Sequence, residues 1–367
     1  MAIGLSIGDN GIISSARNAT EQWEQGAANE QDELKQIANF INSNGGSNNS
    51  GGEDTEKSEV EEARDSENFF DKETTIKDDL DNEIRIPQDF KVAKDSATKV
   101  EDGIVIEDKV GNQFVWIPAK TGSGATIHTT TGDKTIVYQR TAFTEEDITD
   151  DYMETLPTDE ESSVNINGGY YIGRFEAGDK VSTGEGEMRA RGDSQSNEVS
   201  IKAGQAPYNW ATYDAQKSLA EGMGSSRGYT GTTKMASSYA WDTAINFIQI
   251  KVPDYGTNSP QGNYKDTTFS YANIGETEKT ETKARGSELL VLTGQTTPVS
   301  NIYDMGGNCW ERTTGLYLGA SGGILSRRGG SYFSNASDSS AGTRSDCDGE
   351  AYSDESFRVT LFCSTER

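Results

Sequence analysis

The sequence has few residues that support redox or metal chemistry. Among 367 residues there are three cysteines and one histidine. Cys309, Cys347 and Cys363 form no CxxC pair and no spacing typical of a metal site, so one disulfide with a free thiol and three reduced thiols both stay open. His128 lies alone in a Thr-rich stretch, a setting more typical of a solvated residue than of a metal ligand.

Positive charge and long hydrophobic runs are also scarce. The chain carries 33 lysines and arginines against 60 aspartates and glutamates, a formal net charge of −27. This excess repels a phosphate backbone, so nucleic acid is not an expected partner. No run approaches the roughly 20 apolar residues that span a bilayer, and no signal peptide follows Met1. The sequence as given therefore predicts a soluble chain.

Residues 1–43 have the period of a helix. Apolar residues recur there at three- and four-residue steps, and Ser14 or Ser15 is a suitable N-cap. Residues 44–88 are rich in Gly, Ser and Asn and then in charged residues, which favours a flexible acidic linker. Within this linker the apolar residues between Phe69 and Ile86 could dock a short element.

Residues 89–367 have the mixed patterns of an α+β domain. A hairpin is expected around Gly111-Asn112, because two apolar runs flank this turn. The remaining expected elements are a core strand at 170–176, helices at 210–223 and 237–250, a strand at 288–292 and a last strand at 357–361.

The C-terminal part alternates ordered motifs with a polar run. Residues 301–312 read NIYDMGGNCWER, a tight turn that leads to the buried Trp310. Residues 328–333 read RGGSYF and predict a strand whose glycines allow close backbone approach. Residues 334–356 are polar and show neither a helical nor a strand period.

These motifs resemble the formylglycine-generating-enzyme type of C-type lectin fold. Family members read NVYDMAGNVWEW, RGGSW and GFRV in the same order, and FVWIP at 114–118 and YYIGRFE at 170–176 match earlier family strands. The resemblance spans roughly 95 to 363 and implies the fold more firmly than an activity.

The same resemblance argues against retained enzyme chemistry. The family's copper-binding cysteines correspond by spacing to Ser334 and Ser339 here, and a hydroxyl is no substitute for a thiolate as a ligand for Cu(I). Related iron oxygenases need several histidines. We therefore expect no enzyme activity; an oxidase using Cys309 or Cys347 is the rival hypothesis from the enzyme class.

The composition of the polar run is similar to that of variable proteins of diversity-generating retroelements, in which adenine-directed mutagenesis rewrites the codons of a C-terminal segment. Mutated AAY-type codons yield the residues that fill this run, and the variable region would cover about 308–357. Tyr with Ser, Gly and Asn suits recognition. The residues expected to face a ligand are Tyr317, Tyr332, Phe333, Asn335, Ser337, Asp338, Asp346, Asp348, Tyr352 and Asp354. The alternative is a merely solvated loop.

The family resemblance also implies a structural calcium ion. Its ligands would be the carboxylates of Asp304 and Glu311 and the carbonyls of Gly307 and Cys309. The alternative is that Asp304 caps the turn while Glu311 pairs with Arg312 or Arg328.

Residues 1–43 look like the segment that follows the membrane helix of prepilin-like proteins in Gram-positive bacteria. This implies a bacterial cell-surface protein whose hydrophobic anchor preceded Met1 and is missing here. The function expected is non-enzymatic binding of a protein or glycan on a cell or phage surface. A pilus-like structural subunit, with the C-terminal face buried between subunits, is the other alternative.

Overall fold

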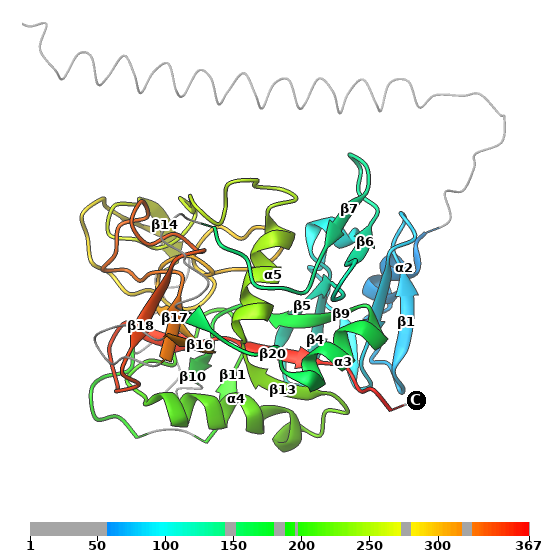
Figure 1. The fold of residues 1–367 in the computed structure, drawn as a ribbon, viewed down its shortest axis with the longest axis horizontal. Coiled ribbons are helices and arrows are strands. Elements are labelled where there is room, and N and C mark those ends of the chain that lie inside the picture. The colour runs from blue at the N-terminus through cyan, green and yellow to red at the C-terminus, as the bar shows by residue number, and fades with distance from the viewer. Residues whose placement is uncertain are drawn as a thin grey trace, which may run out of the picture. The chain divides into compact units, whose positions relative to one another are not determined.

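The computed structural model describes residues 57–143, 152–179, 188–194, 197–272, 280–317 and 325–366. From Lys57 on, the chain forms one compact unit, whose elements are shown in Figure 1. The helix predicted over 1–43 and the first part of the predicted linker, residues 44–56, lie outside the described residues. The described part is a mixed α+β fold, which confirms the predicted class.

A six-stranded antiparallel sheet forms the centre of this unit. Its order is β13-β20-β9-β5-β4-β3. These strands are β3 (Phe90–Val92), β4 (Val105–Asp108), β5 (Gln113–Pro118), β9 (Gly169–Gly173), β13 (Thr232–Met235) and β20 (Val359–Phe362). The predicted hairpin is confirmed as β4 and β5, and Gly111 has a φ of +89° in the turn between them.

A second sheet contains the C-terminal motifs. It is formed by β16 (Trp310–Tyr317), β17 (Leu325–Arg328), β18 (Arg344–Cys347) and β19 (Glu355–Phe357), and β8 (Tyr152–Met153) pairs with the end of β16. Figure 1 shows these strands on the opposite side of α5 from α2 and β1. β19 runs parallel to β16, whereas β17 is antiparallel to both of its neighbours.

Four helices lie in the described residues: α2 (Glu59–Ser66), α3 (Thr158–Asn167), α4 (Tyr213–Arg227) and α5 (Ser238–Ile248). Ser237 caps α5 by accepting a hydrogen bond from the Ala240 amide. Helix α5 contacts both β5 and β16, so it joins the two sheets. No helix in the described ranges is both long and apolar enough to cross a membrane.

The remaining strands form small separate sheets. They are β1 (Thr74–Lys77) with β2 (Glu83–Ile86), β6 (Ala125–Ile127) with β7 (Lys134–Ile136), β14 (Phe269–Ala272) with β15 (Thr280–Lys283), and the three-stranded group β10 (Gly178–Asp179), β11 (Val199–Ser200) and β12 (Ala206–Pro207).

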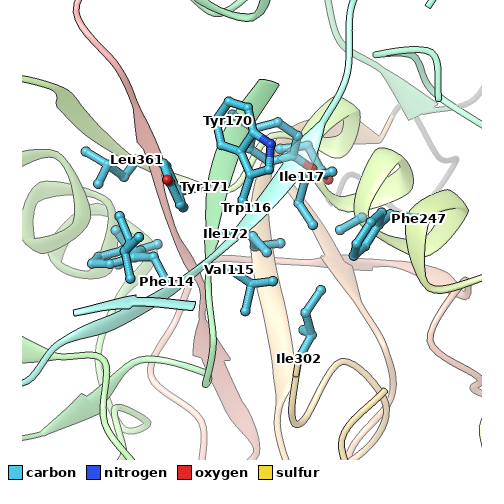
Figure 2. Packing of buried hydrophobic residues seen from close by; sticks show 14 of the residues in the cluster. Phe114, Val115, Trp116, Ile117, Tyr170, Tyr171, Ile172, Phe247, Ile302 and Leu361 are labelled. Carbon is cyan, nitrogen blue, oxygen red and sulfur yellow. Dashed lines mark hydrogen bonds between the residues drawn. The ribbon is translucent and has the colours of Figure 1, made fainter. Parts of the chain in front are cut away.

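The main core lies on both faces of the six-stranded sheet (Figure 2). Val115 and Ile117 face Phe247 of α5, whereas Phe114 and Leu361 lie on the opposite face. All five are fully buried. The continuous apolar run at 114–117 therefore places apolar groups on both faces of the sheet, and helices and loops cover each face.

The predicted linker was too long. Residues 57–88 form α2, β1 and β2, and Val60, Ile84 and Ile86 are fully buried in the domain core. The helix begins with a reciprocal capping box between Ser58 and Glu61, a local signal that the charged composition obscured. The apolar residues that follow bury enough surface to order the segment.

Two predicted strands were also wrong. Residues 288–292 do not join a sheet, because the backbone of Val291 exchanges hydrogen bonds with the side chain of Asn308 instead, both at 3.1 Å. The strand expected at 328–333 ends at Arg328, and the glycines after it turn the chain. Conversely, the run 334–356 contains β18, which sequence period did not indicate.

Replacing Val60 by alanine tests the ordered N-terminal segment. Val60→Ala removes two buried methyl groups, so we expect the free energy of unfolding to fall by roughly 2 kcal/mol in urea titration. The matched control is Val110→Ala at a position that is 51% exposed, where we expect a change within about 0.5 kcal/mol. Equal, negligible effects at both positions would show that α2 is not part of the folded domain.

Candidate functional site

The two sides of the β16–β19 sheet differ. Side chains alternate along each strand and cross-strand partners share a side. Ser326 pairs with Asp346 and Arg328 with Arg344, so these four residues face the same side. Arg328 and Arg344 both form ion pairs there with the buried carboxylate of Asp242 in α5. This side is the interior of the domain.

The other side carries an arginine stacked on a tryptophan. The guanidinium of Arg327 lies 4.8 Å from the centre of the Trp310 ring. Buried Glu355 accepts a hydrogen bond from Nε of Arg312 at 2.7 Å and forms an ion pair with Arg327. Because these residues come from β16, β17 and β19, one carboxylate ties three strands together.

The loop after β17 is folded tightly at its two glycines. Gly329 and Gly330 have φ values of +87° and +73°. A Cβ at Gly330 would lie 2.4 Å from the carbonyl oxygen of Ser339, so no other residue fits this turn. The rings of Tyr332 and Phe333 then pack at a tilt of 34°, with their centres 4.1 Å apart. The close backbone approach predicted for this motif is confirmed.

The loop before β19 lies beside this one. Oγ of Ser331 donates to the carboxylate of Asp354 at 3.0 Å, which links the two loops. The Tyr352 hydroxyl donates to the carboxylate of Asp348 at 2.8 Å, and the amide of Trp210 donates to the Tyr352 carbonyl at 2.9 Å. A side-chain bond thus ties the two loops together, and a backbone bond holds the second loop, while their tips face solvent.

The structure brings most of the predicted ligand-facing residues to these two loops. Six of them are exposed: Phe333, Asn335, Ser337, Asp338, Asp348 and Tyr352. Three are half-buried: Tyr317, Asp346 and Asp354. We call the six exposed residues the C-terminal face. Two of its members are large hydrophobic side chains, Phe333 at 44% and Tyr352 at 41% exposure.

Two predicted residues lie elsewhere. Tyr332 is buried, because its ring packs under Phe333 and against the 353–354 segment. Asp346 faces the interior side of the sheet with Arg344, since the β17–β18 register fixes its orientation. The exposed Leu316 and the contact between Arg327 and Trp310 were not identified from the sequence. The alternation of side chains along the strands 310–317 and 325–328 was the pattern that could have indicated them.

The predicted calcium ligands occupy a tight turn. Asp304 and Asn308 have positive φ values of 59°, and Gly307 has one of 72°. The Gly307 amide donates to the Gly329 carbonyl at 2.8 Å, which fastens this turn to the start of the next loop. Cys309 is buried directly before Trp310.

Both carboxylates of this turn are engaged by protein donors. Asp304 accepts hydrogen bonds from the Gly294 amide at 2.7 Å and the Thr296 hydroxyl at 2.8 Å, so it caps a loop. Glu311 forms a two-point ion pair with Arg358, whose Nε lies 2.8 Å from the carboxylate. In the described ranges, no three His, Cys, Asp or Glu side chains gather in a way that could hold a metal ion. This donor arrangement does not fit the calcium site that the resemblance implies.

The alternative to calcium was that Glu311 pairs with Arg312 or Arg328, but its partner is Arg358. Arg312 forms an ion pair with Glu355, and Arg328 forms one with Asp242 on the opposite side of the sheet. Arg358 precedes β20 and reaches Glu311 from the six-stranded sheet. A partner so distant in sequence is not visible in the local pattern.

Burial raises the pKa values of the carboxyl groups near this turn. The pKa of Glu311 rises from 4.5 to about 7, although the attraction of Arg358 opposes the shift. Burial also raises the pKa of Glu176, and the negative charges of Asp304 and Glu311 raise it further. The Asn308 amide donates a hydrogen bond to Glu176, which opposes this rise.

The three cysteines are buried and free. Burial raises the thiol pKa of Cys309, Cys347 and Cys363. A thiol that stays protonated at neutral pH is a poor nucleophile and a poor metal ligand. This arrangement offers no support for the oxidase hypothesis.

Comparison with known proteins yields no family. No family model matches the chain, and no curated protein matches it. Among solved structures, PvdO from Pseudomonas aeruginosa is 16% identical over 70% of this chain and 97% of its own, with a TM-score of 0.37. CarF is 18% identical over 37% of this chain and 49% of its own, with a TM-score of 0.26. Neither similarity assigns a fold or a function.

The Glu311–Arg358 pair generates a pH-dependent prediction. Arg358→Met leaves Glu311 buried without its cation, so we expect a loss of about 3 kcal/mol or more in the free energy of unfolding at pH 8. A carboxyl group whose folded-state pKa exceeds its unfolded value binds more protons when folded, so stability returns as the pH falls toward 5. Urea titrations at pH 8 and pH 5 measure this difference.

The matched control is Arg64→Met, which breaks an exposed ion pair with Asp65. We expect a change below about 1 kcal/mol at both pH values. If Arg358→Met were as mild as this control, Glu311 would not depend on its arginine.

Calcium dependence is a separate prediction. Because protein donors engage both carboxylates, we expect the melting temperature to be the same in about 5 mM EDTA and in about 5 mM added calcium chloride. This calcium concentration is roughly five to fifty times the Kd of a weak extracellular calcium site, so binding at such a site would raise the melting temperature. A rise of several degrees with calcium, absent in Glu311→Gln, would contradict the described geometry and favour the site implied by the family resemblance.

Proposed function

We propose that this chain is a non-enzymatic binding protein that presents its C-terminal face on a C-type lectin scaffold of the formylglycine-generating-enzyme type. The proposal rests on one observation: within residues 310–357, one set of residues holds the backbone in place and a different set faces solvent. Buried ion pairs and glycine turns hold the strands, while the exposed residues of the two loops are Phe, Tyr, Asn, Ser and Asp, together with Glu350. Rigid aromatic groups among adaptable polar ones are typical of diversified binding surfaces.

The proposal extends to how the face varies and where it acts. We infer that the codons of this region are diversified by a retroelement, because the exposed residues of the two loops, apart from Glu350, match the products of mutated AAY-type codons. We also infer display on a bacterial cell surface through a prepilin-like N-terminal segment, on the strength of the sequence resemblance of residues 1–43. The partner would be a protein or a glycan on a cell or phage surface.

Exposure of the loop tips favours binding over a catalytic role. The three thiols are buried, and Ser334 and Ser339 stand where the enzymes carry copper-binding cysteines. The apolar groups of Phe333 and Tyr352 are open to solvent instead of covering a closed cavity. A surface with exposed aromatic groups and a polar rim is typical of a protein-recognition site.

Binding is tested on a glycan array and on a panel of purified bacterial surface proteins. The test variant replaces Phe333, Asp348 and Tyr352 by alanine. We expect it to lose at least about tenfold in affinity for any target that the parent binds, because exposed aromatic anchors dominate such interfaces. The control variant replaces Phe69, Ile166 and Asp133, two exposed apolar residues and an exposed carboxylate elsewhere on the unit.

The two outcomes separate the hypotheses. Loss of binding in the folded test variant, with full binding in the control, assigns recognition to the C-terminal face. If both variants bind like the parent, the face is not the binding surface. The diversification hypothesis is tested independently by sequencing the native locus: a near-copy of codons 317–357, differing mainly at adenines beside a reverse transcriptase gene, supports it, and its absence contradicts it.

A further inference from the structure

A polar pocket lies apart from the C-terminal face. It has a volume of about 270 Å³ and lies where the β4–β5 turn, the end of β9 and the loops after β11 and before β16 meet. The residues that line it and matter here are Asp95, Gln113, Arg174, Phe175, Lys202 and Tyr303. Two are cations and one is an anion, which makes the pocket locally positive in a chain of net charge −27.

Arg174 is a built-in cation of this pocket. Its side chain is 5% exposed, and the rings of Phe175 and Tyr303 each lie 5.5 Å from its guanidinium carbon. Nη1 donates to the carboxylate of Asp95 at 2.7 Å and to the Gln113 amide oxygen at 2.8 Å. Nε is buried and has no hydrogen-bond acceptor among the described residues. The aromatic rings fix the guanidinium plane, which an exposed arginine would not keep.

Lys202 supplies a second cation. It is half-buried, lines the same pocket and forms no ion pair with any described residue. Its Nζ reaches over the β4–β5 turn, 3.7 Å from where a Cβ would stand at Gly111. Two acids that bond to lining residues are already engaged: Glu107 pairs with Lys91 and accepts from Gln113, and Asp304 accepts from Gly294. The ammonium group is therefore not neutralised by its surroundings.

Asp95 shows what kind of group binds to Arg174 in this pocket. Its side chain is 63% exposed, yet its carboxylate lies 2.7 Å from the buried guanidinium. An exposed carboxylate gains little from such a contact and is readily displaced by another oxyanion. A planar guanidinium beside an ammonium group is suited to carboxylate or phosphate.

We propose that this pocket binds a small ligand through a carboxylate or phosphate group, with Arg174 and Lys202 as the binding residues and Asp95 as an internal competitor. The volume suits a ligand of few atoms and is below that of most drug-sized sites. The ligand's non-charged part would lie against the rings of Phe175 and Tyr303. This site is independent of the function proposed for the C-terminal face.

The test follows the amide signals of Gly111 and Gly294, which line the pocket, in the isotopically labelled full chain by nuclear magnetic resonance. Sodium phosphate and sodium benzoate are titrated separately at constant pH and ionic strength. We expect saturable shifts at these two amides. Lys202→Met should weaken binding about tenfold, and Asp95→Asn should tighten it several-fold, because it removes the competing charge while keeping an acceptor for Arg174.

Lys217→Met is the matched control, since this lysine lies on α4 and changes the net charge equally. It should leave both affinities unchanged. Saturation by benzoate alone assigns the pocket to organic carboxylates, and saturation by phosphate alone assigns it to phosphate-bearing ligands. If neither anion shifts the two amides in the parent or in Asp95→Asn, or if Lys202→Met and Lys217→Met weaken binding equally, the proposal is wrong.

Discussion

The C-terminal half of this domain depends on arginines that have been taken entirely out of water. The side chains of Arg312, Arg328, Arg344 and Arg358 have no exposed surface. Removing a charge from water costs several kcal/mol, which is recovered only when a carboxylate and further hydrogen-bond acceptors are placed correctly. Each arginine therefore fixes the position of an acid that comes from another element.

These pairings connect elements that are distant in sequence. Asp242 joins α5 to β17 and β18, Glu355 joins β19 to β16 and β17, and Glu311 joins β16 to the start of β20. A buried ion pair is weak evidence of net stability, but it penalises every arrangement that separates the partners. The sheet that carries the C-terminal face is thus specified by charge pairing, whereas the six-stranded sheet is specified by apolar packing on both faces.

This difference explains what could be predicted from the sequence. The β4–β5 hairpin, the helices α4 and α5 and the tight turn before Trp310 followed from local patterns, because periodicity and glycine positions encode them directly. The ion-pair partner of Glu311 could not be predicted from local patterns, because Arg358 lies 47 residues away in the sequence. The structure of residues 288–292 could not be predicted either, because the Asn308 side chain makes the backbone hydrogen bonds that a neighbouring strand would make.

Among the predicted ligand-facing residues, too, some features could be predicted from the sequence and others depend on long-range contacts. Composition indicated which segment would carry exposed polar and aromatic groups, and six of the ten residues are exposed in loops. Composition cannot distinguish Tyr332 from Phe333, however, because the turn at Gly329 and Gly330 decides which ring points inward. The strand register likewise decides the orientation of Asp346, and register depends on the arginine pairings described above.

The loops of the C-terminal face are positioned mainly through backbone groups. The Lys265 amide donates to the Ser334 carbonyl at 2.8 Å, and the Gly342 amide donates to the Gly256 carbonyl at 3.0 Å. Such bonds persist whichever side chain stands at the loop tip. Substitution at exposed positions then changes the surface without changing the path of the chain, provided that the glycines and the arginine pairs beneath are kept. A scaffold with this property can tolerate many sequences at one face, which is the physical requirement for a diversified binding site.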